Sequence, residues 1–198
     1  IVARTAAKRV GPTGKVTGVD RNEAMLAVAR AASATLHPAI EWKQGDAANL
    51  PVPDGAYDVV TSQQALQFFP DRIAAIREMH RALAPAGRLA LSMLRSLHHN
   101  AKFAQFSDLL ERHAGPDAGI MMRSPFVDVD VKRFREILAA ADFASVRLMI
   151  VSAAVRYPSA EAMFRWEAAS SPLSEELLGM DEGTTARLVD EVLRTFSD

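Results

Sequence analysis

The sequence predicts an α/β fold, a Rossmann-like doubly wound and mostly parallel sheet in a three-layer αβα arrangement with a helical C-terminal cap. Three observations predict it. Short apolar segments alternate with amphipathic helical segments over the first ninety residues. Their spacing suits right-handed crossovers, which make successive strands parallel. The second half is mostly helical in pattern, and 198 residues with 49% hydrophobic content can bury a sizeable core.

The first half contains four predicted strands and the helices between them. Helix signals cover residues 2–9 and 71–83, and Asn22 caps a third helix whose inner face would hold Met25, Leu26, Ala29 and Ala32. Pro85-Ala86-Gly87 is expected to end the helix at 71–83. Between and after these helices the sequence predicts strands at 15–19, 40–44, 57–62 and 88–94.

The second half adds helices and one further strand region. The pattern predicts a strand, or two strand segments, over 145–157, ended by Pro158. The predicted helices are 100–114, 130–141, 159–169, 173–179 and 184–196. We expect one domain, in which 1–157 contains the sheet and 158–198 is a helical C-terminal segment.

Composition excludes several classes of function. The formal net charge of −1 leaves no basic surplus for a nucleic acid, so we expect no nucleic-acid partner. No cysteine is present, which excludes disulfides, cysteine-ligated zinc and iron–sulfur clusters. No His, Asp or Glu cluster has metal-ligand spacing, so we predict no metal. No apolar run approaches about 18 residues, so we expect no membrane span and a cytoplasmic protein.

Two acidic residues follow successive predicted strands, where open α/β sheets bind their ligands. Asp20 can accept hydrogen bonds from both hydroxyls of a ribose. Asp46 can accept from the amino group of adenine, and the N–H of Ala47 can donate to a ring nitrogen. The alternative interpretation makes Asp20 a helix-capping residue and Asp46 a turn residue.

Three stretches resemble a known family. VTGVDRNEAMLAVAR at 16–30, IEWKQGDAANLPVPDGAYDVVTSQQALQFFPD at 40–71 and AAIREMHRALAPAGRLALSML at 74–94 are similar to class I S-adenosylmethionine (SAM)-dependent methyltransferases. The branch is the small-molecule one that includes ubiquinone-biosynthesis-type enzymes (methyltransferase type 11). The resemblance covers 1 to about 95 and continues more weakly through 124–157. It implies SAM as cofactor, S-adenosylhomocysteine as product, and 1–157 as a SAM-binding domain.

The resemblance also assigns roles to single residues. It places Asp20 on the ribose hydroxyls, with Arg21 and Met25 beside the adenosine, and Asp46 and Ala47 on the adenine. It places Gln63 or Gln64 beside the methionine part, and Gln67 near a position where relatives often have His. For Met25 the alternative is an ordinary core methionine of an amphipathic helix.

The sequence departs from the family pattern at both ends. The glycine-rich loop and the strand before it have no counterpart, since Gly11-Pro12-Thr13-Gly14 precedes a strand rather than following one. The closing antiparallel strand is also missing. We therefore expect the natural protein to extend beyond both ends of this chain.

Methyl transfer from a sulfonium needs alignment and exclusion of water more than it needs a general base. His98 and His99, which follow the fourth predicted strand, are the candidates for a base if the acceptor needs one; the alternative is surface histidines. Apolar residues of the second half predict an apolar or aromatic acceptor, the alternative being that they form core. They are Phe103, Phe106, Met121, Met122, Phe126, Phe164 and Trp166.

The leading interpretation is a SAM-dependent methyltransferase that acts on a small molecule, with a homodimer left open. The first alternative is an NAD-dependent oxidoreductase, because an acid after a strand also binds the NAD ribose. The second is a catalytically inactive methyltransferase-like binding subunit. Binding of SAM, of NAD or of neither distinguishes the three.

Overall fold

A computed structural model describes residues 1–126, 131–143, 145–153, 155–170 and 177–196. The chain divides into two compact units. Unit 1 comprises Ile1–Met93 and Lys132–Val146, and unit 2 comprises Leu94–Val131 and Arg147–Asp198. These limits differ from the boundary expected between 157 and 158. That boundary concerns domains rather than compact units and stays a prediction.

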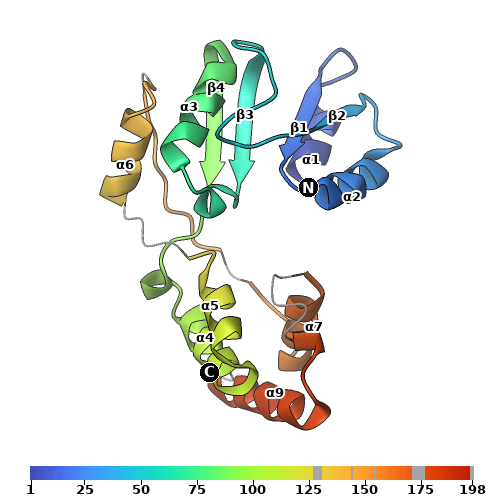
Figure 1. Ribbon diagram of the computed structural model, residues 1–198, viewed down its shortest axis with the longest axis vertical. Coiled ribbons are helices and arrows are strands. Elements are labelled where there is room, and N and C mark those ends of the chain that lie inside the picture. The colour runs from blue at the N-terminus through green and yellow to red at the C-terminus, as the bar shows by residue number, and fades with distance from the viewer. Residues whose placement is uncertain (127–130, 144, 154, 171–176, 197–198) are drawn as a thin grey trace. The chain divides into compact units, whose positions relative to one another are not determined.

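Unit 1 begins with a parallel pair of strands joined by a helix (Figure 1). The Asn22 side chain accepts from the N–H groups of Ala24 and Met25, which starts the helix as predicted. Trp42 Nε1 donates to Ser33 Oγ at 3.0 Å and ties the helix to the second strand. The elements are α1 (Val2–Arg9), β1 (Val16–Asp20), α2 (Glu23–Ser33) and β2 (Ile40–Gln44).

A second parallel pair follows, again connected through a helix. The carboxylate of Asp71 accepts from Ala74 N at 2.9 Å and caps that helix. The helix ends at Ala82, before Pro85–Gly87. Pro85–Gly87 itself lies inside the last strand, where the pairing register shifts. Ala86 has a φ of +66° there, and a Cβ on Gly87 would lie 2.8 Å from the carbonyl oxygen of Ala84. The elements are β3 (Tyr57–Gln63), η1 (Leu66–Phe68), α3 (Arg72–Ala82) and β4 (Leu83–Ser92).

The four strands form two separate two-stranded sheets, β1–β2 and β3–β4. The hydroxyl of Tyr57, at the start of β3, donates to Thr17 Oγ1 on β1 at 3.0 Å. Strands β1 and β3 are not paired in the described structure, so this side-chain hydrogen bond links the two sheets. The predicted α/β class with parallel strands is confirmed, and the expected sheet is present as two pairs.

The buried face of α2 is narrower than predicted. Leu26 is fully buried and Ser33, seven residues later, is 6% exposed, whereas Met25 is 58% exposed and Ala32 is also exposed. The prediction for Met25 and Ala32 is therefore wrong. Consecutive helical residues differ by about 100° in direction, and Met25 lies beside the buried stripe rather than on it.

Residues that follow α6 (Val131–Ala139) contact helix α3. Ile76 and Met79 of α3 are buried. Arg77 Nε donates to the carbonyl of Ala140 at 3.1 Å, and the His80 ring meets Phe143 edge-on with centroids 4.7 Å apart. This segment belongs to unit 1, although the residues before it in the chain, Leu94–Val131, belong to unit 2.

Unit 2 is a helical cluster with its own core. Arg123 bonds Asp108 and Glu111, which joins α5 to α4, and Glu191 bonds Arg112 and His113, which joins α9 to α4 (Figure 1). Its helices are α4 (Ala101–Ala114), α5 (Pro116–Arg123), α7 (Ala160–Ser170) and α9 (Glu182–Phe196). The buried core residues are Phe106, Leu109, Leu110, Ala118, Met122, Phe126, Met163, Leu177, Leu188 and Val192.

The strand region expected over 145–157 is not a strand in the structure. Its described residues, 145–153 and 155–157, belong to no helix or strand. Met149, Ile150 and Val151 are each more than 60% exposed. Apolar β-branched residues favour a strand only where a neighbouring strand supplies ladder partners, and the described structure pairs none with them. Of the helix predicted over 173–179, residues 173–176 lie outside the described part.

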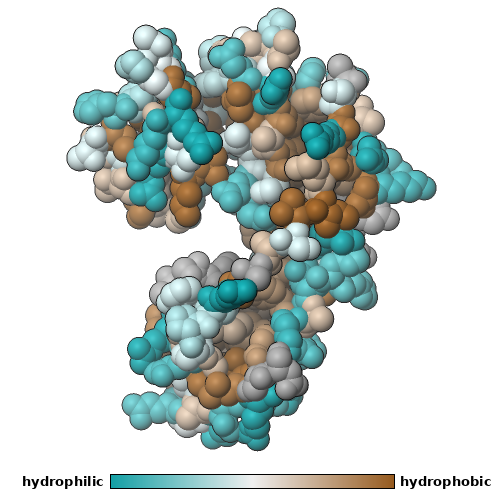
Figure 2. All heavy atoms as spheres, turned by 180° about the vertical axis from the view of Figure 1, so that it is seen from behind, coloured by the Kyte–Doolittle hydropathy of each residue, from teal (hydrophilic) through white to brown (hydrophobic). Residues whose placement is uncertain are grey.

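Apolar and polar side chains are interspersed on the face of both units shown in Figure 2. No described helix is long and apolar enough to cross a membrane. The residues that the structure covers also bring no three His, Asp or Glu side chains together as a metal site. The expectation of a metal-free protein stays a prediction.

Candidate functional site

The carboxyl ends of β1 and β2 lie side by side. Asp20 is the last residue of β1 and stands opposite Gln44, the last residue of β2. The N–H of Gly45 donates to the Asp20 carbonyl at 3.0 Å, and Gln44 Nε2 donates to the Arg21 carbonyl at 3.1 Å. The structure therefore brings Asp20 and Arg21 next to the turn that contains Asp46 and Ala47.

One of the two carboxylate oxygens of Asp20 is hydrogen-bonded within the chain. Oδ1 accepts from the N–H of Asn22 at 2.8 Å, which fixes the carboxylate at the strand end. Oδ2 has no hydrogen-bond partner among the described residues, and the side chain is exposed. The helix cap is Asn22, so the capping alternative for Asp20 is wrong. The free oxygen is the one available to a ligand.

Asp46 is arranged in the same way in a tight turn. Its Oδ1 accepts from Ala48 N at 2.8 Å, and its carbonyl accepts from Asn49 N at 3.0 Å. Within the described parts of the chain, Asp46 Oδ2 and the N–H of Ala47 have no partner. A Cβ on Gly45 would lie 2.4 Å from Pro51 Cδ, so the close return of the loop requires glycine there.

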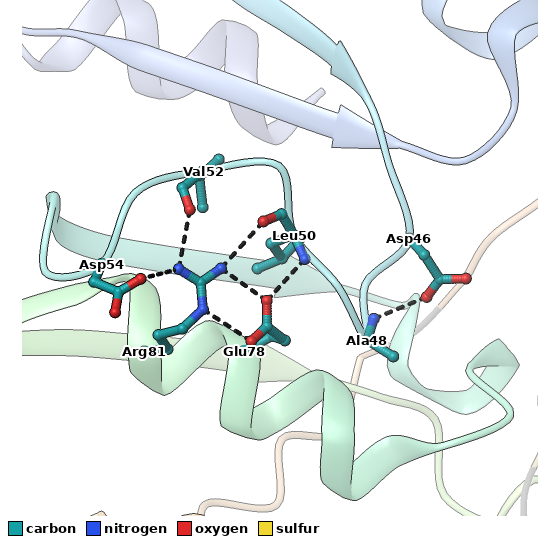
Figure 3. A network of polar contacts seen from close by, with 7 residues as sticks. All are labelled: Asp46, Ala48, Leu50, Val52, Asp54, Glu78 and Arg81. Atoms are coloured by element: carbon teal, nitrogen blue, oxygen red, sulfur yellow. Dashed lines mark hydrogen bonds and ion pairs between the residues drawn. The ribbon is translucent and has the colours of Figure 1, made fainter.

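The loop after this turn is attached to α3 by two charged residues (Figure 3). Arg81 donates to the carbonyls of Leu50 and Val52, at 3.1 and 3.0 Å, and pairs with Glu78 and Asp54. Glu78 accepts from Leu50 N at 2.8 Å. The hydrogen bond from Arg81 holds the pKa of Glu78 below its usual value, against the opposing effect of burial. Glu78 is therefore ionised at neutral pH.

The glutamines lie at the end of β3 and just after it, in the other pair of strands. Gln63 ends β3 opposite Ser92, and Gln64 takes a φ of +53° while its N–H donates to the Ser92 carbonyl at 2.9 Å. Gln67 Nε2 donates to Gln64 Oε1 at 3.3 Å. Gln67 is only 5% exposed, and among the described residues neither Gln67 Oε1 nor Ser62 Oγ has a hydrogen-bond partner.

The candidates for catalysis and for the acceptor belong to unit 2. His98 and His99 are exposed residues of η2 (Leu97–His99), and His99 Nε2 contacts Arg95 Nη2 at 2.5 Å. Their role as a base stays a prediction. Phe106 and Met122 form core, as the alternative interpretation had it, whereas Trp166 is 54% exposed.

Sequence reasoning missed Glu78 and Arg81. Each is a polar residue on an amphipathic helix and would be placed on its solvated face. The available signal was the loop itself, because Pro51 and Pro53 leave a stretch with few N–H donors and several carbonyls that need partners. Their tertiary contacts span 27 to 31 residues of sequence, which local patterns do not show.

Known proteins are similar mainly to the N-terminal part of the chain. The family model described as a methyltransferase domain matches residues 1–91. The demethylmenaquinone methyltransferase of Listeria monocytogenes is 44% identical over 86 residues, which is 42% of this chain and 36% of the relative. The Staphylococcus aureus protein of the same name is 42% identical over 80 residues, 40% of this chain and 33% of the relative. The match spans about a third of these relatives.

Solved structures extend the similarity to more of the chain. The arsenic(III) SAM methyltransferase of Chlamydomonas reinhardtii has 25% identity and a TM-score of 0.51, covering 71% of this chain and 47% of that one. The YcgJ protein of Bacillus subtilis has 20% identity and a TM-score of 0.54, covering 92% of this chain and 72% of that one. The latter likeness supports the fold alone.

Residues 1–91 match this methyltransferase-domain family. The matching family and structures are those of class I SAM-dependent methyltransferases, as the sequence motifs predicted. The match also supports SAM as the cofactor of the domain.

Proposed function

We propose that the protein transfers a methyl group from SAM to a small-molecule acceptor. The observation that supports it most is the pair of acidic residues at adjacent strand ends. Asp20 and Asp46 each fix one carboxylate oxygen within the chain and leave the other without a partner in the described structure. The family match of residues 1–91 supplies the chemistry that such a pair would serve.

The unpartnered groups fit an adenosine. Asp20 Oδ2 would accept from ribose hydroxyls, and the Asp46 carboxylate would accept from the amino group of adenine. The N–H of Ala47 would donate to a ring nitrogen of the base. Arg21 lies beside Asp20 in sequence, and Met25 is exposed on the first turn of α2, where it can contact the adenosine. The ribose and the adenine would thus bind to residues at the ends of neighbouring strands.

Methyl transfer requires that the acceptor be aligned with the methyl group and that water be excluded. SAM, when bound, supplies a methyl group already activated by its positive sulfur. Glutamine side chains after β3 would orient the methionine part through hydrogen bonds, with Gln63 or Gln64 as the predicted contacts. An acceptor that must lose a proton needs a base. His98 and His99 stay the candidates for that role.

The proposed acceptor is small and apolar or aromatic. The curated relatives are named demethylmenaquinone methyltransferases, so a demethylmenaquinone is the first acceptor to assay. An NAD-dependent oxidoreductase or an inactive binding subunit is not favoured, because the matching family and structures are methyltransferases. A homodimer and a cytoplasmic location stay predictions from the sequence.

Calorimetric titration with SAM and with NAD tests the proposal. We expect SAM to bind and NAD not to bind. Asp20→Ala and Asp46→Ala should each weaken SAM binding about ten-fold or more, since a hydrogen bond to a charged group contributes about 1.5–3 kcal/mol. Asp58→Ala, on exposed β3 surface, is the control and should bind normally. Binding of NAD alone, or unchanged SAM affinity in both site variants, would contradict the assignment.

A further inference from the structure

We propose that Arg81, together with Glu78, is a positioning residue that holds the loop from Gly45 to Asp54 in the conformation that recognises adenine. The inference rests on the proposed function, because it concerns the same loop. It adds two residues that touch neither the cofactor nor the acceptor. Their effect reaches the site through the backbone of the loop.

All three nitrogens of the Arg81 guanidinium donate hydrogen bonds (Figure 3). Nε and Nη2 form a two-pronged pair with the carboxylate of Glu78, at 2.8 and 2.7 Å. Nη2 also donates to the Leu50 carbonyl at 3.1 Å, and Nη1 to the Val52 carbonyl at 3.0 Å. Only a planar fork of donors can reach these oxygens together, which distinguishes arginine from lysine here.

Glu78 provides a second attachment for Leu50, a residue of the loop. Its Oε2 accepts from the N–H of Leu50 at 2.8 Å, while Arg81 bonds the Leu50 carbonyl. Both backbone groups of Leu50 are therefore fixed to α3. The side chains of Glu78 and Arg81 are 19% and 29% exposed, so water competes weakly. The contact of Arg81 with Asp54, whose side chain is 81% exposed, contributes little by comparison.

The loop needs such an attachment. It connects β2 to β3, which belong to separate sheets. Pro51 and Pro53 have no N–H, so this stretch can be held mainly through its carbonyl groups. Leu50 lies four residues after Asp46, and the turn between them is closed by the bond from Asn49 N to the Asp46 carbonyl. Fixing Leu50 therefore fixes one end of the turn that presents Asp46 and Ala47.

Preorganisation of this kind has a measurable consequence. If the loop is competent for a fraction of the time, the apparent dissociation constant rises by the inverse of that fraction. A loop that is competent a tenth of the time binds about ten-fold more weakly. The rate at saturating SAM does not change, because the pair contacts no reacting atom.

The test compares Arg81→Lys with Arg77→Lys, an arginine one turn earlier on α3 that bonds the Ala140 carbonyl and not the loop. We expect Arg81→Lys to raise the dissociation constant and the KM of SAM about ten-fold, with an unchanged rate at saturating SAM. Hydrogen exchange at the Leu50 amide should become faster. Arg77→Lys should change none of these. Glu78→Gln keeps an acceptor for Leu50 N and should give a smaller increase.

The outcomes separate the two proposals. Failure of the unchanged protein to bind SAM overturns the proposed function and this inference with it. Normal SAM affinity in Arg81→Lys, with the Leu50 amide exchanging faster, overturns only this inference. If Arg81→Lys does not fold, Glu78→Gln decides through the same readouts. A fall in the saturating rate with unchanged KM would also overturn a positioning role.

Discussion

At the scale of single residues, Gln67 is costly for stability. It is 5% exposed, and its amide oxygen has no partner among the described residues. An unsatisfied buried polar group costs about 1–3 kcal/mol. Its main-chain carbonyl is held by Arg72 Nη2 at 3.1 Å, so the backbone around it is fixed. A group of this kind after β3, where α/β sheets bind ligands, is a candidate for ligand contact, and that role stays a prediction.

Gln67→Met tests this trade-off. Methionine has a similar length and removes the unpartnered oxygen together with the 3.3 Å hydrogen bond from Nε2 to Gln64 Oε1, so the two effects oppose each other and we expect the free energy of unfolding to change by no more than about 1 kcal/mol. Methyl transfer should fall, because an acceptor or SAM loses its hydrogen-bond partner. Chemical denaturation and a transfer assay measure the two effects. Ser62→Ala, which removes the other buried side-chain oxygen without a partner in the described part of the chain, is the comparison.

A large loss of stability in Gln67→Met would show that the amide oxygen is satisfied in solution, for example by water. Unchanged transfer would show that the residue has no role in the site. Either result removes Gln67 from the candidates without touching Asp20 or Asp46.

At the scale of elements, local signals in the sequence predicted most of what the structure contains. Asn22 and Asp71 mark helix starts, because a cap acts on N–H groups two or three residues away. The strand over 145–157 was wrong, because a strand depends on partners far along the chain. Asp20 and Asp46 could be proposed as site residues from their positions at strand ends and from the family resemblance. Arg81 depends on contacts with a distant loop, which no local pattern reveals.

We expect the contact between α4 and α9 to depend on pH. Glu191 bonds His113 Nε2 and Arg112 Nη1, both at 2.6 Å. The hydrogen bond to His113, followed by that to Arg112, holds the pKa of Glu191 below its ordinary value of 4.5. A carboxylate whose pKa is lowered by folding stabilises the protein above its unfolded pKa, and this contribution is lost as the pH falls through the folded pKa.

We therefore expect Glu191→Gln to be less stable than the unchanged protein at pH 7, with the difference shrinking below about pH 4.5. Urea denaturation at pH 7, 5 and 3.5 measures it. Glu182→Gln, at the start of the same helix, is the matched control and should show a smaller difference at pH 7. A stability difference for Glu191→Gln that does not change with pH would contradict the ionic contribution.

At the scale of the whole molecule, the two compact units have separate cores. Unit 1 buries Leu26, Ile76 and Met79, and unit 2 buries the helical core that includes Leu188. Each unit contains one of the two tryptophans, Trp42 in unit 1 and Trp166 in unit 2. Fluorescence of single-tryptophan variants therefore reports on one unit at a time.

Leu188→Ala removes a fully buried side chain from the core of unit 2. Truncating a buried leucine costs about 2–5 kcal/mol through lost burial and the cavity left behind. We expect the denaturation midpoint reported by Trp166 to fall, and the midpoint reported by Trp42 to move much less. Leu26→Ala, in unit 1, should give the converse pattern. Equal shifts of both tryptophan signals in both variants would show that the two cores unfold as a single cooperative unit.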